Sequence, residues 1–424
     1  MHLLRYLSLP WSAKSFYGWR LLVASCVIMG FSSGIITYSA TVFFIPVSTA
    51  LGLNRTTMSV AFSLARAENF LLAPIVGYFI DRLGPKRPII FGMTMAGIGL
   101  ILFGLFTNSF LLFILTWTFM VSVGTNIGGF APNWAMINNW FNRKKGRAMG
   151  FGMAAQAAGG VLLAPLVAIL ISNVGWRVAA IIAGIALLLV VLPFAMMIRT
   201  RPSDMGLLPD GDPLEGNSPA ITSGQSTIAG ITHFTVQQVV RIPAFWILNL
   251  AMGLRQFGQS GMIFHFSPLL QDRGFSAIMA GSTVGLLAFM GIGGAILGGW
   301  VSDRYERRRV MAIIVLFETL ALALLFLATS AWQVYVFVLI YGFGGGAHAL
   351  NRAILGEYFG QDHYAKIWGI LSMATTPLAA AGPIFTGGVF DYFGNYNIAI
   401  ITFVVVYAVS AVAYFICRKP SLQI

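Results

Sequence analysis

The sequence predicts an all-α membrane protein with twelve transmembrane helices, arranged as two parallel, pseudo-repeated bundles of six. Three observations support this fold class. First, 58% of the 424 residues are hydrophobic and only 9% are charged, whereas soluble proteins carry about 25% charged residues. Second, the chain holds twelve apolar stretches, each at least as long as the ~20 residues that one spanning helix needs. Third, landmarks of the first half recur in the second half at a nearly constant offset.

Short polar segments separate the twelve apolar stretches. In lipid each stretch must be a helix, because every backbone polar group needs a partner within the chain. A β-barrel is excluded because its strands show alternating segments of about ten residues rather than long apolar runs. The predicted spans are 18–47, 54–80, 87–106, 110–139, 145–172, 177–198, 242–270, 276–302, 308–328, 332–357, 363–391 and 396–416.

Basic residues are distributed unevenly between the two sets of segments that connect the spans. One set, which includes both termini, holds most of the arginines and lysines, and the opposite set holds only Arg55, Arg177 and Arg273. Because positively charged loops stay in the cytoplasm, we expect both termini there and a multi-pass protein of the inner (plasma) membrane. The net charge of +13 follows from this topology and does not indicate nucleic-acid binding.

A polar segment divides the chain. Residues 199–241 are rich in Pro, Gly, Ser and Asp and too poor in apolar residues to form a core of their own. We therefore predict an N-terminal six-helix bundle at 1–198, a cytoplasmic linker with a short amphipathic helix at 199–241, and a C-terminal six-helix bundle at 242–424.

The two halves repeat each other. Gly77 begins GYFIDRLGPKRP and Gly299 begins GWVSDRYERRRV, so an Asp-Arg pair lies four residues after a glycine in each half, at an offset of 303 − 81 = 222. A shared offset across several landmarks indicates an internal repeat. Six spans return the chain to the same side, so the repeats are parallel. The other landmark pairs are Pro46 and Pro268, Gly52 and Gly274 (offset 222), and Gly150 and Gly369, Gly175 and Gly394 (offset 219).

The segment from Gly77 to Arg87 resembles the signature of the major facilitator superfamily, and the resemblance extends over essentially the whole chain. Phe16-Tyr-Gly-Trp19-Arg and Trp140-Phe-Asn-Arg-Lys-Lys-Gly-Arg-Ala-Met-Gly150 resemble its monocarboxylate porter and oxalate–formate antiporter branch. The resemblance implies the major facilitator fold and a secondary active transporter of a small organic anion, foremost a monocarboxylate. It also implies rocker-switch alternating access. Members of the branch use a basic residue in the eighth span, and residues 276–302 contain none.

The sequence contains no P-loop, dinucleotide fingerprint, metal-ligand spacing or nucleophile elbow. We therefore expect no enzyme activity, catalytic residue, metal site or cofactor. Transport energy would come from a gradient or from exchange, with protons as a candidate coupling ion. The resemblance implies a monomer whose partners are the substrate anion and the lipid bilayer.

Ionisable residues at membrane depth are costly and are therefore functional candidates. Arg255 lies near the middle of the seventh span. The resemblance implies that this span borders the central cavity of the major facilitator fold. The planar guanidinium of arginine suits a carboxylate. We predict Arg255 as the main substrate ligand; the alternative is a structural pairing with backbone carbonyls or a helix carboxylate. Arg66 is a candidate second anion ligand. The other predicted substrate contacts, for which packing is the alternative, are Tyr38, Asn126, Gln256 and His348.

Two further residues are candidates for carrying a coupled proton. Glu68 lies in the second span and His265 near the end of the seventh; the alternatives are an interhelical polar clamp for Glu68 and a plain hydrogen-bonding role for His265. Glu318, in the peripheral ninth span, is expected to be structural. The resemblance implies that gating residues hold the halves in one conformation, namely Asp81, Arg82, Asp303 and Arg304.

Two other functions remain open at this point. An exporter of neutral or cationic amphiphilic compounds, of the drug-efflux type, needs an acidic cavity residue, and only Glu68 qualifies. A transporter-like receptor that senses a ligand without moving it is the second alternative. The chain has no large extramembrane signalling segment, which counts against the receptor.

Overall fold

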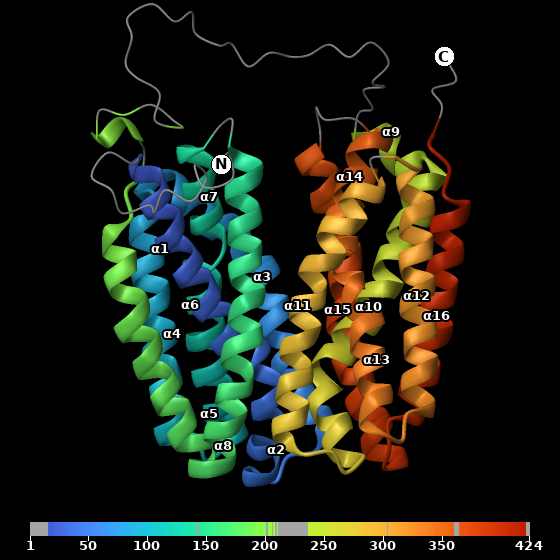
Figure 1. Cartoon of the computed structure of the whole chain (residues 1–424), viewed down its shortest axis with the longest axis horizontal. Coiled ribbons are helices and arrows are strands. Elements are labelled where there is room, and N and C mark those ends of the chain that lie inside the picture. Colours follow the sequence, from blue (N-terminus) through green and yellow to red (C-terminus); the bar gives the residue numbers. More distant parts are fainter. Residues whose placement is uncertain are drawn as a thin grey trace, which may run out of the picture. The chain divides into compact units, whose positions relative to one another are not determined.

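A computed structural model describes residues 16–141, 144–200, 202–205, 207, 210, 236–302, 304–359 and 364–420. Within these ranges all regular elements are helices (Figure 1). The all-helical architecture predicted from composition is confirmed, and each predicted span corresponds to a helix or to a short series of helices. The orientation of the termini stays a prediction.

The helices of the first six predicted spans are interrupted at several points. The first and fourth spans each contain a π-helical segment. The fifth and sixth spans are two helices that meet at a kink at Gly175, where φ is 79° and ψ is 161° and the backbone is not helical; the label α8 covers both. The elements are α1 (Tyr17–Ser32), π-helical Ser33–Tyr38, α2 (Ala40–Ala50), α3 (Arg55–Leu83), α4 (Lys86–Phe106), α5 (Phe110–Phe113), π-helical Ile114–Ser122, α6 (Val123–Gly128), α7 (Ala131–Trp140) and α8 (Lys145–Met197).

The last six spans follow a short helix that ends the connecting segment. The tenth span is interrupted by a single 3₁₀ turn at its three consecutive glycines. The elements are α9 (Val236–Arg241), α10 (Pro243–Asp272), α11 (Ala277–Ser302), α12 (Arg307–Leu327), α13 (Ala331–Gly342), the 3₁₀ turn Phe343–Gly346, α14 (Ala347–Phe359), α15 (Tyr364–Phe393) and α16 (Asn397–Ile416).

Among the described residues, nine helical stretches are long and apolar enough to cross a membrane. One of them, Arg147–Met197, has 51 residues and contains two spans, since about 20 residues cross the bilayer once. The helices α3 and α10 have 29 and 30 residues, which is also sufficient. Polar and ionisable residues, Arg66 and Arg255 among them, lower the mean hydropathy of these two helices.

The internal repeat is visible in the backbone. Gly52 and Gly274, one landmark pair, have φ of 62° and 87°, and Gly175 and Gly394, another pair, have φ of 79° and 69°. Residues with a side chain disfavour this left-handed conformation, whereas glycine adopts it readily. The paired glycines therefore have a shared structural cause: each repeat turns at the same points along its path.

The chain divides into two compact units whose boundaries do not follow the sequence halves. The first unit comprises residues 1–38, 71–163 and 173–225, and the second comprises 39–70, 164–172 and 226–424. The second unit thus combines α2 and the start of α3 with the last six spans. The domain boundaries predicted at residues 198 and 241 stay a prediction.

Hydroxyl groups hold α2 and α3 within the second unit. Thr41 Oγ1 donates to the carbonyl of Phe264 on α10 at 3.0 Å, and Ser63 Oγ donates to the carbonyl of Ala380 on α15 at 2.7 Å. In the first unit, Ser25 Oγ on α1 donates to Asn133 Oδ1 on α7 at 2.7 Å. Such polar contacts between spanning helices stabilise their packing because lipid offers no competing partner.

Candidate functional site

Arg255 forms a buried ion pair with Glu318 of α12. Arg255 Nε donates to Glu318 Oε2 at 2.8 Å, and Nη2 donates to Oε1 at 2.6 Å and to the Gly344 carbonyl at 2.8 Å. Only 1% of the Arg255 side chain and 2% of the Glu318 side chain are exposed. A side chain at position 344 would collide with the Glu318 carboxylate, so glycine is needed there.

This geometry matches the alternative weighed for Arg255, a pairing with a helix carboxylate and a backbone carbonyl. The charge of Arg255 is balanced inside the protein in this structure, and the guanidinium fixes α10 against α12 and the 3₁₀ turn. The assignment of Arg255 to the substrate stays a prediction. Glu318, expected to be structural, is the partner that the sequence did not connect with Arg255.

A polar pocket lies among α10, α14 and α15. Its volume is about 120 Å³. Pairs of side chains one helical turn apart line it together: Met252 and Gln256 on α10, and Trp368 and Ser372 on α15. Asn351 on α14 is buried and accepts a hydrogen bond from the Tyr414 hydroxyl at 2.8 Å. The remaining lining residues are Arg352, Leu371, Thr375 and Thr376.

Arg352 supplies the positive charge of this pocket. It is exposed, although its neighbour Asn351 is 4% exposed, because successive residues on a helix point about 100° apart. Its Cζ atom lies 5.6 Å from the centroid of the Trp368 ring, which is within the range of a cation–π contact. Arg352 is not among the site residues predicted from the sequence. The available signal was an arginine five residues before the predicted end of the tenth span.

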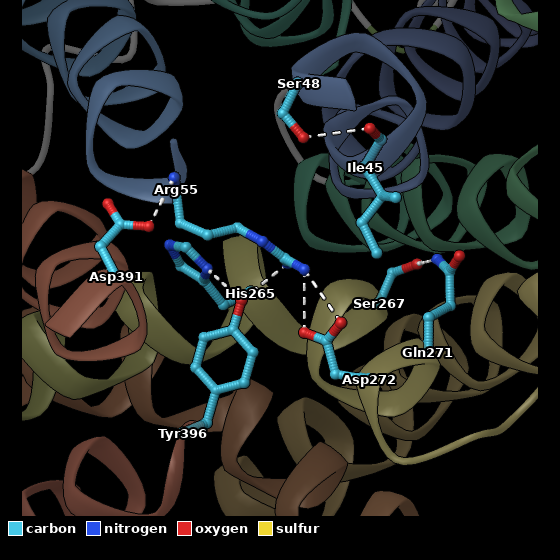
Figure 2. A network of polar contacts seen from close by, with 9 residues as sticks. All are labelled: Ile45, Ser48, Arg55, His265, Ser267, Gln271, Asp272, Asp391 and Tyr396. Carbon is cyan, nitrogen blue, oxygen red and sulfur yellow. Dashed lines mark hydrogen bonds and ion pairs between the residues drawn. The ribbon is translucent and has the colours of Figure 1, made fainter. Parts of the chain in front are cut away.

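A second polar cluster joins the start of α3 to the ends of α10 and α15 (Figure 2). Arg55 Nη2 lies 2.9 Å from both carboxylate oxygens of Asp272, and Nη1 donates to the Tyr396 hydroxyl at 2.9 Å. Asp391 accepts hydrogen bonds from the backbone N–H groups of Arg55 and Thr56 at 2.9 and 2.8 Å. We call these five residues the Arg55 cluster. It links the first sequence repeat to the second within one unit.

His265 lies directly beside the Arg55 cluster (Figure 2). Its Nδ1 is 3.0 Å from the Tyr396 hydroxyl, and its Nε2 is 2.8 Å from Ser59 Oγ and 3.1 Å from the Pro383 carbonyl. Both ring nitrogens have partners in the protein, and the side chain is buried. This arrangement agrees with the hydrogen-bonding alternative, while a proton-carrying role for His265 stays a prediction.

The other predicted site residues are distributed over both units. Gln256 lines the polar pocket, and Glu68 is half-buried on α3. Tyr38 and Asn126 belong to the first unit, where the Tyr38 ring packs directly on Gly160 of α8. The side chains of Arg66, Asp81 and His348, and residue Asp303, lie outside the part of the chain that the structure describes.

Of the four predicted gating residues, the structure describes the side chains of Arg82 and Arg304. Arg82 Nη1 donates to the Tyr78 hydroxyl at 2.7 Å on the same helix, and the Arg304 Cζ atom lies 3.7 Å from the centroid of the Trp300 ring. A gating role for these residues stays a prediction. In the described residues, no group of three or more His, Cys, Asp or Glu side chains could hold a metal ion.

Comparisons with known proteins agree on one family. The family model described as Major Facilitator Superfamily matches residues 22–317 and 294–423. The oxalate:formate antiporter of Oxalobacter formigenes is 25% identical over 404 residues, covering 95% of this chain and 92% of that protein. Human monocarboxylate transporter 11 is 24% identical over 393 residues, covering 90% of this chain and 79% of that protein.

A solved structure supports the same fold. The crystal structure of a bacterial homologue of the human lysosomal transporter Spinster, in an inward-facing and occupied conformation, superposes with a TM-score of 0.71. The match covers 96% of this chain and 98% of that chain at 18% sequence identity. The family match, the full-length relatives and this fold agree with the resemblance predicted from the signature at Gly77. The chain therefore belongs to the major facilitator superfamily and is a multi-pass membrane transporter related to the oxalate:formate antiporter and to monocarboxylate transporters.

Proposed function

We propose that this protein transports a small organic anion, foremost a monocarboxylate, and that Arg352 binds the carboxylate. The observation that carries the proposal is that Arg352, an exposed residue, lines a polar pocket together with Gln256, Ser372 and Thr375. An arginine fork pairs with a carboxylate through two parallel hydrogen bonds, and neighbouring hydroxyl and amide groups fix the orientation of the ligand.

The size of the pocket favours a small substrate. Pockets for drug-sized ligands have volumes of roughly 300–1,000 Å³, whereas this pocket has about 120 Å³. A compact anion such as formate, acetate or oxalate suits this volume better than an amphiphilic drug. The similarity to an oxalate:formate antiporter and to monocarboxylate transporters supports the same substrate class.

This proposal departs from the sequence-based prediction that Arg255 is the main substrate ligand: because Arg255 is paired with Glu318, it is given a positioning role. Its ion pair with Glu318 fixes the rotation of α10, and the next residue, Gln256, then faces the pocket. Members of the monocarboxylate porter and oxalate–formate antiporter branch carry a basic residue in the eighth span. In this protein Arg352 of the tenth span would take over its function. Arg66, Tyr38, Asn126 and His348 stay candidate substrate contacts.

We further propose rocker-switch alternating access with a closing contact at each end of the spans. The Arg55 cluster would close the end at which α10 and α15 finish. Asp81, Arg82, Asp303 and Arg304 would act at the other end, where α3 and α11 finish. Glu68 or His265 would carry a coupled proton. The loop-charge bias supports cytoplasmic termini in an inner (plasma) membrane.

The test measures ligand binding to purified protein by thermal stabilisation, with formate, acetate, oxalate and lactate at acidic and neutral pH. A ligand that binds the folded state raises its apparent stability. We expect Arg352→Gln to weaken binding of the stabilising anion about 10- to 100-fold, as for the loss of one hydrogen bond to a charged group, which contributes roughly 1.5–3 kcal/mol. Arg352→Lys should retain part of the affinity. Arg241→Gln, an exposed arginine on α9, is the matched control.

Flux of the same anion into liposomes then separates transport from sensing. If Arg352→Gln binds the anion as tightly as the wild type, the assignment of Arg352 is wrong. If no carboxylate stabilises the protein and amphiphilic cations do, the exporter hypothesis replaces the anion hypothesis. Binding without flux would favour the receptor.

A further inference from the structure

A large apolar groove lies between α11 and α12, separate from the polar pocket. Its volume is about 620 Å³. Leu297, Ile313 and Phe317 form its walls, and between 50% and 55% of each of these side chains is exposed. Gly298 on α11 has no side chain and leaves the space towards Ile314 of α12 open. Because both helices are long enough to span the membrane, this groove faces an environment in which acyl chains are the available apolar ligands.

One end of the groove is cationic. Arg304 and Arg309 line it there, beside Tyr305 and the carboxylate of Glu306. The surrounding segment 303–309 contains four arginines against Asp303 and Glu306, so its net charge is 4 − 2 = +2. Glu306 is shared by Arg308 and Arg309, at 3.1 and 2.7 Å, and 59% of the Arg309 side chain remains exposed.

Aromatic side chains mark this end as lying at the membrane–water interface. The Arg304 guanidinium lies over the Trp300 ring, with 3.7 Å from Cζ to the ring centroid. The Trp300 and Tyr305 side chains are 56% and 68% exposed. Trp and Tyr concentrate at the headgroup level of bilayers, and at that level Arg304 and Arg309 would meet lipid phosphates.

We propose that this groove binds one anionic phospholipid. An acyl chain would lie along the apolar walls, and the phosphate would accept hydrogen bonds from Arg304 and Arg309. Guanidinium groups bind phosphate through charge-assisted hydrogen bonds, and the net positive charge of the segment favours a headgroup with net negative charge over a zwitterionic one. The lipid site is independent of the substrate proposed above, because its residues do not line the pocket that contains Arg352.

The experiment measures thermal stabilisation and retained lipid, by native mass spectrometry, for the full-length protein. The probes are phosphatidylglycerol, phosphatidylcholine and glycerol phosphate. Arg304→Gln with Arg309→Gln removes the charges, and Gly298→Leu fills the groove while leaving them intact. A Cβ at position 298 would lie 3.4 Å from Leu350 and 3.7 Å from Ile314, so the backbone tolerates a side chain there. Arg241→Gln with Arg418→Gln removes two exposed arginines elsewhere and is the matched control.

We expect phosphatidylglycerol to bind more tightly than phosphatidylcholine, and glycerol phosphate to have little effect. The Arg304/Arg309 variant should bind phosphatidylglycerol about 10- to 30-fold more weakly. Gly298→Leu should also lose binding, and the control should keep it. The proposal is overturned if the control loses as much affinity as the Arg304/Arg309 variant, if phosphatidylcholine binds equally well, or if glycerol phosphate alone stabilises the protein.

Discussion

Arg255 and Arg55 both pair with carboxylates in the second unit, but in opposite surroundings. The Arg255–Glu318 pair is 1% and 2% exposed, whereas the Arg55–Asp272 pair is 14% and 31% exposed. Separating a buried pair leaves charges in an apolar interior, at a cost of several kcal/mol per ion. Water can replace the partners of a partly exposed pair, whose net contribution is roughly 0–1 kcal/mol. Burial therefore makes one pair a fixed element and leaves the other able to open.

The largest expected effect tests the fixed pair. Glu318→Gln leaves the Arg255 guanidinium buried without a counter-charge, and we expect it to lower the free energy of unfolding by about 3–5 kcal/mol. Equilibrium unfolding of the purified protein in mixed micelles measures the change. Glu306→Gln, an exposed carboxylate just before the same helix, is the control and should change stability little.

A double variant sharpens this test. Arg255→Met with Glu318→Leu removes both charges and fills the space with apolar side chains, so we expect most of the lost stability to return. If Glu318→Gln is as stable as the wild type, the pair does not have the structural role assigned to it here.

An intermediate effect concerns the Arg55 cluster. Asp272→Asn removes the negative charge that faces Arg55, so this end of the unit should open more often. A cysteine at Ser59, which is fully buried beside His265, reports opening by its rate of thiol labelling, in a background where Cys26 and Cys417 are replaced by Ser. We expect the thiol at position 59 to be labelled about fivefold faster in Asp272→Asn than with Asp272 intact, because the ion pair contributes roughly 1 kcal/mol to the closed state.

The matched control for this prediction is Glu357→Gln, which removes a comparably exposed ion pair with Arg307. Unchanged labelling in Asp272→Asn, or equal acceleration in Glu357→Gln, would show that the Arg55 cluster does not close this end.

The smallest expected effect is that of salt. At about 1 M ionic strength the Debye length falls to ~3 Å, and partly exposed charges are screened while buried pairs are not. High salt should therefore modestly accelerate thiol labelling of the Ser59→Cys protein when Asp272 is intact, and scarcely accelerate it when Asp272→Asn is also present. The stability difference between wild type and Glu318→Gln should not change with salt. A salt-dependent difference there would contradict the burial argument.

The sequence was informative wherever a property belongs to one segment. Span positions follow from local hydropathy, and the glycines that mark the repeat, Gly52, Gly274, Gly175 and Gly394, have positive φ in the structure. It was uninformative about partners. Arg255 and Glu318 are 63 residues apart, and Arg55 lies 217 residues from Asp272 and 336 from Asp391, so no local pattern connected them. From the sequence, Arg55 was therefore recognised only as one of the basic residues that indicate the membrane topology.

The sequence by itself determined that the protein is a helical membrane transporter of the major facilitator superfamily, because composition, span count and the motif at Gly77 are properties of the linear chain. Only the tertiary structure decided which arginine faces a pocket. Arg255 and Arg352 are both arginines within spans, yet helix rotation buries the first against Glu318 and exposes the second beside Trp368. That rotation is set by packing among α10, α12, α14 and α15, which depends on all the contacts of these helices at once.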